Sequence, residues 1–314
     1  MTRLGLGLTL AGLLLLGSPA VAETTATVAP AEPLAKPAAG TIQVLDRDAS
    51  GRPLLARVAL VHGLPDFAES RMTLGGTWSY LIRDGDGVLV LDVGPRFPLA
   101  WSLVPWASWK VLTPKLDGNA HILKAVETVY PGCPITTIVM THWHADHTED
   151  APALQRLAFE RWGVRPPLRM TAADRPHRWR GLFPIGAEAT FSAAGFHRSE
   201  WTWGLDLREG ERLGKTGFRV LCLPGHTAGN IALVDPDRRI SLGPTPRIEP
   251  PRESLWAEDM ETYRATALRF YHATFGYRHF STHPGREATE TWPGAPESEK
   301  VPVSGHEFHG HACD

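Results

Sequence analysis

His142-Trp143-His144-Ala145-Asp146-His147 is the stretch of the sequence that says most about the fold. It places three imidazoles and one carboxylate within six residues, directly after the apolar run 135–140. Imidazole nitrogen and carboxylate oxygen are the ligands that zinc prefers at reactive sites. A chance grouping of polar loop residues would give the same stretch, so a further ligand elsewhere in the chain is needed to favour a metal site.

Two such ligands are present. His226 stands in Pro224-Gly225-His226-Thr227 after the apolar segment 219–223, and His283 stands in Thr282-His283-Pro284-Gly285 after the segment 277–280. Loops that leave the carboxyl ends of several strands meet at one edge of an α/β sheet. Side chains two residues apart in extended chain share a side, so we expect His142 and His144 to bind one ion, with a second ion nearby.

The rest of the chain alternates between predicted strands and helices. Segments 77–82 and 88–92 flank the turn Arg83-Asp84-Gly85-Asp86-Gly87 and predict a hairpin. Further strands are predicted at 135–140, 219–223, 231–234 and 239–242, and one-sided helices at 119–130, 150–162 and 259–270. This alternation is typical of a layered α/β domain.

These motifs resemble those of the metallo-β-lactamase superfamily of metallo-hydrolases over roughly residues 75–285. The resemblance implies a four-layer αββα sandwich with a two-metal site at the loop ends. It implies two zinc ions with separate ligands, His142, His144 and His226 for the first and Asp146, His147 and His283 for the second. Asp92 would lie behind the site and orient a ligand. Asp146 would also orient the attacking water or accept its proton.

The sequence departs from the superfamily at the aspartate that usually bridges both metals. The corresponding stretch is Ser241-Leu242-Gly243-Pro244-Thr245, with proline in place of the bridge, unless Asp235 or Asp237 takes that role. Two zinc ions bring +4, and Asp146 with one hydroxide returns −2, which leaves about +2. We therefore expect an anionic substrate and a weakly held second ion. The branch of zinc-dependent β-lactamases with Asp-His-His at the second metal also lacks the bridge, whereas the iron-dependent redox branches use it.

The N-terminus predicts export. Arg3, the apolar stretch 4–16 and Ala20-Val21-Ala22 have the layout of a signal peptide over residues 1–22, although an uncleaved anchor is the alternative. We expect an Ala/Pro-rich linker at 23–40, the metallo-β-lactamase-like domain at 41–285 and a flexible tail at 286–314. The mature protein would be periplasmic or secreted, without a membrane span. The tail contains residues that can bind soft metal ions, namely His306, His309, His311 and Cys313. We expect either adventitious metal binding there or a tail that is simply solvated.

The predicted function is hydrolysis of a small amide or ester, such as a β-lactam or lactone, by a metal-bound hydroxide. A thioesterase of the glyoxalase II type and a non-catalytic zinc-binding protein are the alternatives. The net charge of −2 gives no electrostatic reason to expect nucleic acid as a partner.

Several substrate-facing and structural assignments stay open. Aromatic side chains after the Asp92 strand either form a wall for the substrate or pack as core, namely Trp101, Trp106 and Trp109. The same two alternatives apply to Trp201 and Trp203. A segment in the middle of the chain contains Arg175, Arg178 and Arg180. These side chains either bind a carboxylate of the substrate or belong to a solvated basic loop. A Cys133–Cys222 bridge is one possibility, and a buried free thiol at Cys222 is the other.

Overall fold

A β-hairpin lies at the centre of the first sheet, as the sequence predicted. In the computed structural model, which describes residues 37–60, 77–96, 115–176, 178–180, 183–244 and 257–283, β3 (Trp78–Asp84) pairs antiparallel with β4 (Gly87–Leu91). Asp84 lies opposite Gly87, so the turn consists of Gly85 and Asp86. Gly85 has a φ of +64°, which glycine adopts without steric cost.

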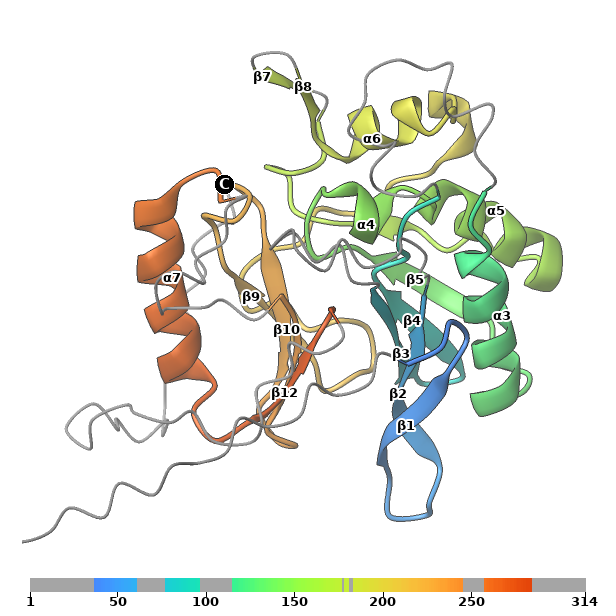
Figure 1. Ribbon diagram of the computed structural model, residues 1–314. Coiled ribbons are helices and arrows are strands. Elements are labelled where there is room, and N and C mark those ends of the chain that lie inside the picture. Colours follow the sequence, from blue (N-terminus) through green and yellow to red (C-terminus); the bar gives the residue numbers. More distant parts are fainter. Residues whose placement is uncertain are drawn as a thin grey trace, which may run out of the picture. The chain divides into compact units, whose positions relative to one another are not determined.

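The first sheet combines antiparallel and parallel neighbours. Its order is β1 (Ile42–Arg47), β2 (Pro53–Ala59), β3, β4, β5 (Ile135–Val139) and β6 (Leu168–Arg169). The pairs β4–β5 and β5–β6 are parallel, and each therefore needs a crossover connection. These connections contain α3 (Gly118–Val129) and α5 (Ala151–Trp162), which lie beside the sheet in Figure 1.

The second sheet has the order β12 (Arg278–Ser281), β11 (Ile240–Gly243), β10 (Ile231–Asp235) and β9 (Arg219–Cys222). β11 and β12 run parallel, and α7 (Met260–Ala273) connects them and covers the outer face of this sheet (Figure 1). Shorter elements complete the described residues, namely α4 (Ala145–Thr148), β7 (Arg178–Arg180), β8 (Phe183–Ile185), α6 (Ala187–Ala193) and the 3-10 helix η1 (Arg198–Glu200).

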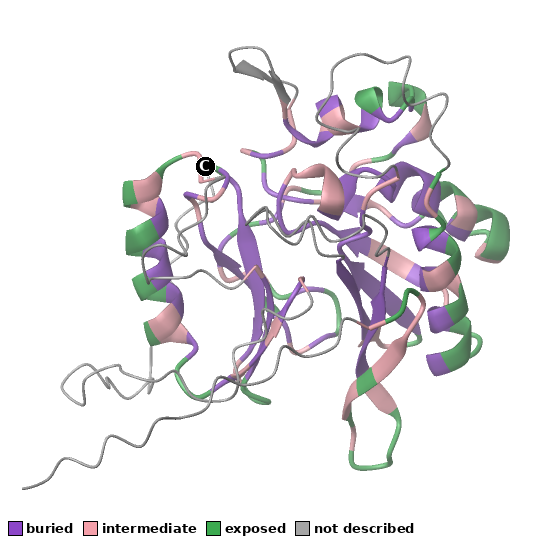
Figure 2. Cartoon of the chain, in the orientation of Figure 1, coloured by how far each residue is buried: buried purple, intermediate pink, exposed green. Residues whose placement is uncertain are grey.

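Alternation along the strands divides the interior into layers. In β4, Val88 and Val90 belong to the core against α3 and α5, whereas Leu89 and Leu91 belong to the core between the two sheets. A third core joins the second sheet to α7 through Phe270. Figure 2 shows α3, α5 and α7 buried on one side and exposed on the other. The four-layer αββα architecture is therefore confirmed.

Local chemistry explains where the long helices begin and end. Asp259 precedes α7, and its carboxylate accepts hydrogen bonds from the backbone N–H groups of Glu261 (3.0 Å) and Thr262 (3.1 Å). α5 ends at Gly163, whose φ of +71° is the usual left-handed stop. α7 extends to Ala273, three residues beyond the predicted segment 259–270, and Ala273 still packs against the core of the second sheet.

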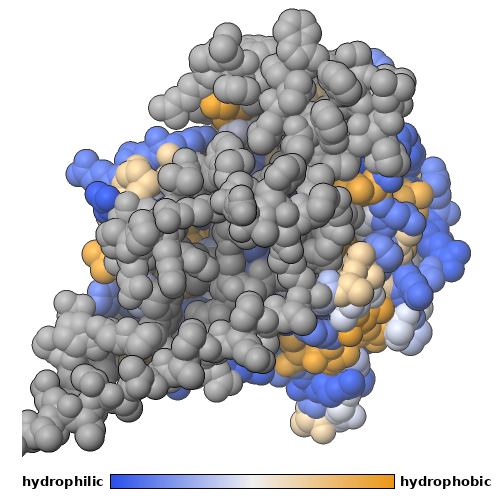
Figure 3. All heavy atoms as spheres, viewed as in Figure 1, coloured by the Kyte–Doolittle hydropathy of each residue, from blue (hydrophilic) through white to orange (hydrophobic). Residues whose placement is uncertain are grey.

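No helix among the described residues is long and apolar enough to cross a membrane. The described residues on the face seen in Figure 3 are largely hydrophilic, with hydrophobic groups between them. The signal peptide, most of the linker and the tail lie outside the described residues, so the domain boundaries at 22, 40 and 285 stay predictions.

Candidate metal centre

The predicted ligand segments lie at one edge of the two sheets, where backbone hydrogen bonds join them. His142 and His144 follow β5, and the neighbouring Thr141 accepts a hydrogen bond on its carbonyl from Ile231 N of the second sheet (2.9 Å). On the other side, Trp78 N donates to the carbonyl of Thr282 (2.8 Å), the residue before His283. These two bonds bring the end of β5 and the end of β12 to the same rim.

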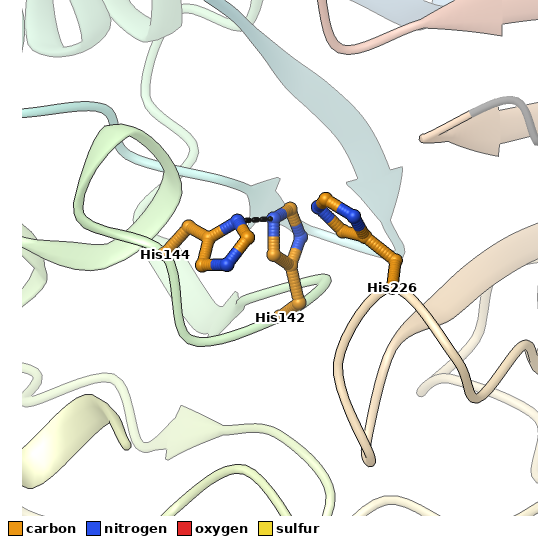
Figure 4. Close-up of side chains that lie close together, drawn as sticks. All are labelled: His142, His144 and His226. Atoms are coloured by element: carbon orange, nitrogen blue, oxygen red, sulfur yellow. Dashed lines mark hydrogen bonds between the residues drawn. The ribbon is translucent and has the colours of Figure 1, made fainter. Parts of the chain in front are cut away.

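The first cluster consists of His142, His144 and His226, whose potential ligand atoms all lie within 4.8 Å of one another. His142 Nε2 is 3.0 Å from His144 Nδ1, and the ring of His226 lies 4.7 Å and 4.6 Å from the rings of His142 and His144. Figure 4 shows the three rings converging from two separate loops. Two nitrogens on one tetrahedral zinc are about 3.4 Å apart, given Zn–N bonds of about 2.0–2.1 Å. The donor set therefore fits a divalent cation.

The second cluster consists of Asp146, His147 and His283 and meets the same distance limit of 4.8 Å. His147 Nε2 lies 3.3 Å from His283 Nε2, and Asp146 Oδ2 lies 3.5 Å and 3.8 Å from these two nitrogens. The rings of His142 and His147 are 4.2 Å apart, so the two clusters are direct neighbours. This spacing suits a pair of cations that act on one bound molecule.

Asp92 organises both clusters from behind. The side chain is fully buried, and its Oδ2 contacts His147 Nδ1 at 2.8 Å. The same carboxylate accepts hydrogen bonds from Thr141 N (2.8 Å) and Thr141 Oγ1 (2.9 Å). Thr141 Oγ1 in turn lies 3.0 Å from His142 Nδ1. If each Nδ1 carries the proton, every contact is satisfied, and the Nε2 atoms of both histidines are left as ligands.

Burial and neighbouring charges shift the pKa values of four of the ligands. Desolvation holds the pKa values of His142 and His226 well below the usual range and lowers that of His144 to about 4. Burial alone would raise the pKa of Asp146, but the neighbouring imidazoles, His147 foremost, lower it to about 2. Neutral imidazoles and an ionised carboxylate are the forms that bind metal ions.

The sequence also matches the family model described as "Metallo-beta-lactamase superfamily" over residues 72–241, more than half of the chain. The chain belongs to the metallo-beta-lactamase superfamily. Metallo-beta-lactamase superfamily proteins are mostly metal-dependent hydrolases that bind divalent cations, and the two clusters supply ligands for such cations.

One solved structure with a TM-score above 0.5 supports the fold. The chain is similar to a beta-lactamase domain protein from Burkholderia ambifaria, with a TM-score of 0.51 and 17% identity over 79% of this chain and 72% of that one. A metallo-beta-lactamase from Pontibacter korlensis has 15% identity over 77% of this chain and 91% of that one, with a TM-score of 0.45.

A curated relative adds a local match. An atrochrysone carboxyl ACP thioesterase from Cryptosporiopsis sp. (strain 8999) is 32% identical over 87 residues, which is 28% of this chain. The match spans 21% of that relative, about a fifth of its length.

The aspartate that commonly bridges two metals in the superfamily has no counterpart among the described residues. Gly243 lies opposite Ser281 in the parallel pair β11–β12, so Pro244 follows next to the chain that carries His283. A proline side chain has no ligand atom. The alternative bridge, Asp235, is wrong because it lies at the far end of β10 from Ile231, about 13 Å away at roughly 3.3 Å per residue.

Asp235 has a structural role instead. Its side chain accepts hydrogen bonds from the backbone N–H (3.1 Å) and the guanidinium (2.7 Å) of Arg238. Asp237 lies in the turn between β10 and β11, at the same end of the strands, so it is excluded as a bridge as well.

Sequence reasoning missed Asp174, which connects the two loops of the first cluster. Its carboxylate accepts hydrogen bonds from Trp143 N (3.1 Å), Thr227 Oγ1 (2.5 Å) and Gly229 N (2.7 Å). The sequence signal that could have identified Asp174 is its position shortly after β6, because the predicted ligands also follow the ends of strands. Without an imidazole beside it, that position did not stand out.

The structure decides between the open alternatives for some of the other side chains. Arg175 donates a hydrogen bond to Asp206 (2.7 Å) and lies over the ring of Trp203, so the described contacts favour a structural role. Trp201 is 7% exposed and packs in the core against Phe191. The side chains proposed to face the substrate or a carboxylate lie outside those described, namely Trp101, Trp106, Trp109, Arg178 and Arg180.

The cysteines differ from both expectations. Cys133 is a free cysteine, so the Cys133–Cys222 bridge is not formed. Cys222 is disulfide-bonded and 5% exposed, so the expectation of a buried free thiol there was wrong. A sequence with few cysteines does not reveal which of them pair.

Proposed function

We propose that the protein is an exported zinc-dependent hydrolase that opens a small amide or ester of the β-lactam or lactone type. The observation that carries the proposal is the meeting of two adjacent three-residue ligand clusters at one edge of the sheets. A pair of divalent cations held there supplies Lewis acidity and an activated water for attack on a carbonyl carbon.

The residues of the chain hold and orient this centre. Asp92 fixes His147 directly and His142 through Thr141, so one buried carboxylate positions a ligand in each cluster. The side chains of Asp146 and His283 keep 22% and 20% exposure, which leaves the second cluster accessible. Asp146 is therefore the carboxylate best placed to orient an incoming water.

The charge of the site favours a substrate with a negative charge. Asp146 is the carboxylate in the two clusters, and no described carboxylate is shared between them. Two divalent cations beside one ligand carboxylate leave the site strongly positive, and this attracts anions. Zinc is the expected metal because the clusters contain imidazole and carboxylate without a thiolate.

A thioesterase is the second candidate, favoured by the relative named above, which is called a thioesterase. Export weighs against it, because glutathione and coenzyme A thioesters are mainly intracellular. The export proposal comes from the apolar N-terminal stretch 4–16 and the small residues Ala20-Val21-Ala22. Sequencing the N-terminus of the secreted or periplasmic fraction tests it, and a mature chain that still begins at Met1 would contradict it.

The experiment that separates these functions compares substrates on one zinc-loaded sample. Its metal content is first measured by elemental analysis, with about two zinc ions per chain expected. A chromogenic cephalosporin, a lactone and a thioester are then assayed side by side, each with an anionic and a neutral version. Faster turnover of an anionic β-lactam or lactone supports the proposal. Thioester turnover alone would favour the second candidate, and no turnover by the fully loaded protein would favour a metal-binding role.

Replacing Pro244 by Asp should strengthen the binding of the second metal ion. The register of β11 with β12 places this residue beside the chain leading to His283, so the new carboxylate would lie next to the site. We expect loss of the second ion to a chelator to slow by about tenfold, or about 1.4 kcal/mol. Pro244→Asn is the matched control, because it removes the ring without adding charge. Equal rates for the two variants would contradict the placement of residue 244.

A further inference from the structure

Asp174 contributes no ligand, yet it contacts both loops that supply the first cluster. Trp143, whose backbone N–H donates to Asp174 Oδ2, stands between the ligands His142 and His144. Thr227, whose hydroxyl donates to the same oxygen, follows the ligand His226 directly. One carboxylate oxygen therefore links the backbone between His142 and His144 to the residue that follows His226.

The surroundings of Asp174 are built around these contacts. Its side chain is 2% exposed, and its other oxygen, Oδ1, accepts the N–H of Gly229 at 2.7 Å. A Cβ atom on Gly229 would lie 2.0 Å from Thr171 Oγ1 and 2.8 Å from Asp174 Cγ, so only glycine allows this approach. Thr171 Oγ1 also donates to the carbonyl of Gly229 (2.8 Å). Thr171 and Asp174, which follow β6, thus hold the His226 loop through hydrogen bonds to Thr227 and Gly229.

A second connection between the two loops runs through the side chain of Trp143. Trp143 Nε1 donates to Glu258 Oε1 (3.1 Å), and Glu258 N donates to the carbonyl of His226 (3.2 Å). This connection runs through the indole side chain and the residues that precede α7, whereas Asp174 acts on the Trp143 backbone itself. The backbone contact therefore bears more directly on where the flanking imidazoles point.

We infer that Asp174 is a positioning residue for the first metal cluster, and that it sets the separation of His226 from His142 and His144. The second cluster should depend on it less, because the Asp174 carboxylate bonds to Trp143, Thr227 and Gly229, whereas Asp146 and His147 belong to α4 and His283 follows β12. The inference rests on the metal binding proposed above. It predicts that loss of the Asp174 carboxylate weakens zinc binding at the first cluster more than at the second. A general loss of packing would weaken both.

The amide in Asp174→Asn cannot replace the carboxylate. Three donors meet the two carboxylate oxygens, whereas an amide offers one acceptor oxygen and one NH2 group. In either orientation of the amide, the N–H of Trp143 or that of Gly229 faces another donor. The side chain keeps its volume, so the variant tests the hydrogen bonds and not the packing.

The test measures zinc affinity for each cluster separately. In a His283→Ala background, which retains the first cluster, Asp174→Asn should weaken zinc binding by about 10- to 100-fold in competition with a chromophoric chelator. In a His226→Ala background, which retains the second cluster, the same substitution should change the affinity less than about threefold. Asp235→Asn is the matched control, because Asp235 is equally buried and hydrogen-bonded but lies at the far end of β10.

Thr227 provides a test that does not depend on Asp174→Asn being folded. Thr227→Val keeps the shape and removes the hydroxyl, so it should weaken the first cluster, and Thr227→Ser should restore the affinity. Equal losses at both clusters, or an unchanged affinity of the first cluster in Asp174→Asn or Thr227→Val, would overturn the inference. Absence of zinc binding by the unmodified protein would overturn the proposed function and the inference together.

Discussion

Replacing His226 by alanine should remove one equivalent of zinc and abolish hydrolysis. His226 is the one member of the first cluster that does not come from the 142–147 segment, and the two remaining imidazoles cannot complete a three-ligand site. We expect the measured zinc content to fall from about two ions to about one per chain. Turnover should fall by about a thousandfold or more, because the paired cations act together.

His272→Ala is the control for this experiment. His272 is exposed in the last turn of α7 and belongs to neither cluster, so its loss changes the number of imidazoles without affecting the centre. Elemental analysis and turnover of both variants are measured on the same preparation, with circular dichroism to check the fold. A folded His226→Ala protein that retains two zinc ions and full turnover would exclude the proposed centre.

Replacing Asp92 by Asn should weaken metal binding at both clusters while leaving the backbone intact. Asp92 has a φ of +58°, a left-handed conformation that aspartate and asparagine both tolerate. The amide cannot accept from Thr141 N, Thr141 Oγ1 and His147 Nδ1 together. We expect zinc affinity and turnover to fall by about 10- to 100-fold. The free energy of unfolding should fall by about 1–3 kcal/mol, because a buried donor loses its acceptor.

Thr141→Val separates the two arms of this network. It removes the hydroxyl that lies between Asp92 and His142 but leaves the contact between Asp92 and His147 in place. The first cluster should therefore weaken more than the second. If Asp92→Asn lowered the unfolding free energy but left zinc affinity unchanged, Asp92 would act only in the fold at the end of β4.

The elements with a strong periodic pattern were predictable from the sequence. The β3–β4 hairpin has a glycine turn between apolar strands, and α3, α5 and α7 each have one apolar side. The ligand segments were predictable for a similar reason, since histidine after a strand end is a strong chemical signal. The structure brings all six predicted ligands and Asp92 together.

The remaining features depend on contacts between distant segments. β6 has two residues, too few for a periodic pattern, and it forms because Ile138 and Val139 of β5 offer a free edge. Asp174 acquires its role from Trp143 and Thr227, which lie 31 and 53 residues away in the sequence. Such partners are not visible in a local pattern, and neither is the pairing state of a single cysteine.

The parallel pairing of β11 with β12 has a consequence for the order in which the centre matures. During synthesis or translocation, residues 142, 144 and 226 emerge well before β12, so the three-imidazole half can assemble while the last part of the chain is still missing. The half that contains Asp146 closes only when the strand 278–281 docks and delivers residue 283. If both clusters bind ions, the second ion can therefore be held only after the strand 278–281 has docked.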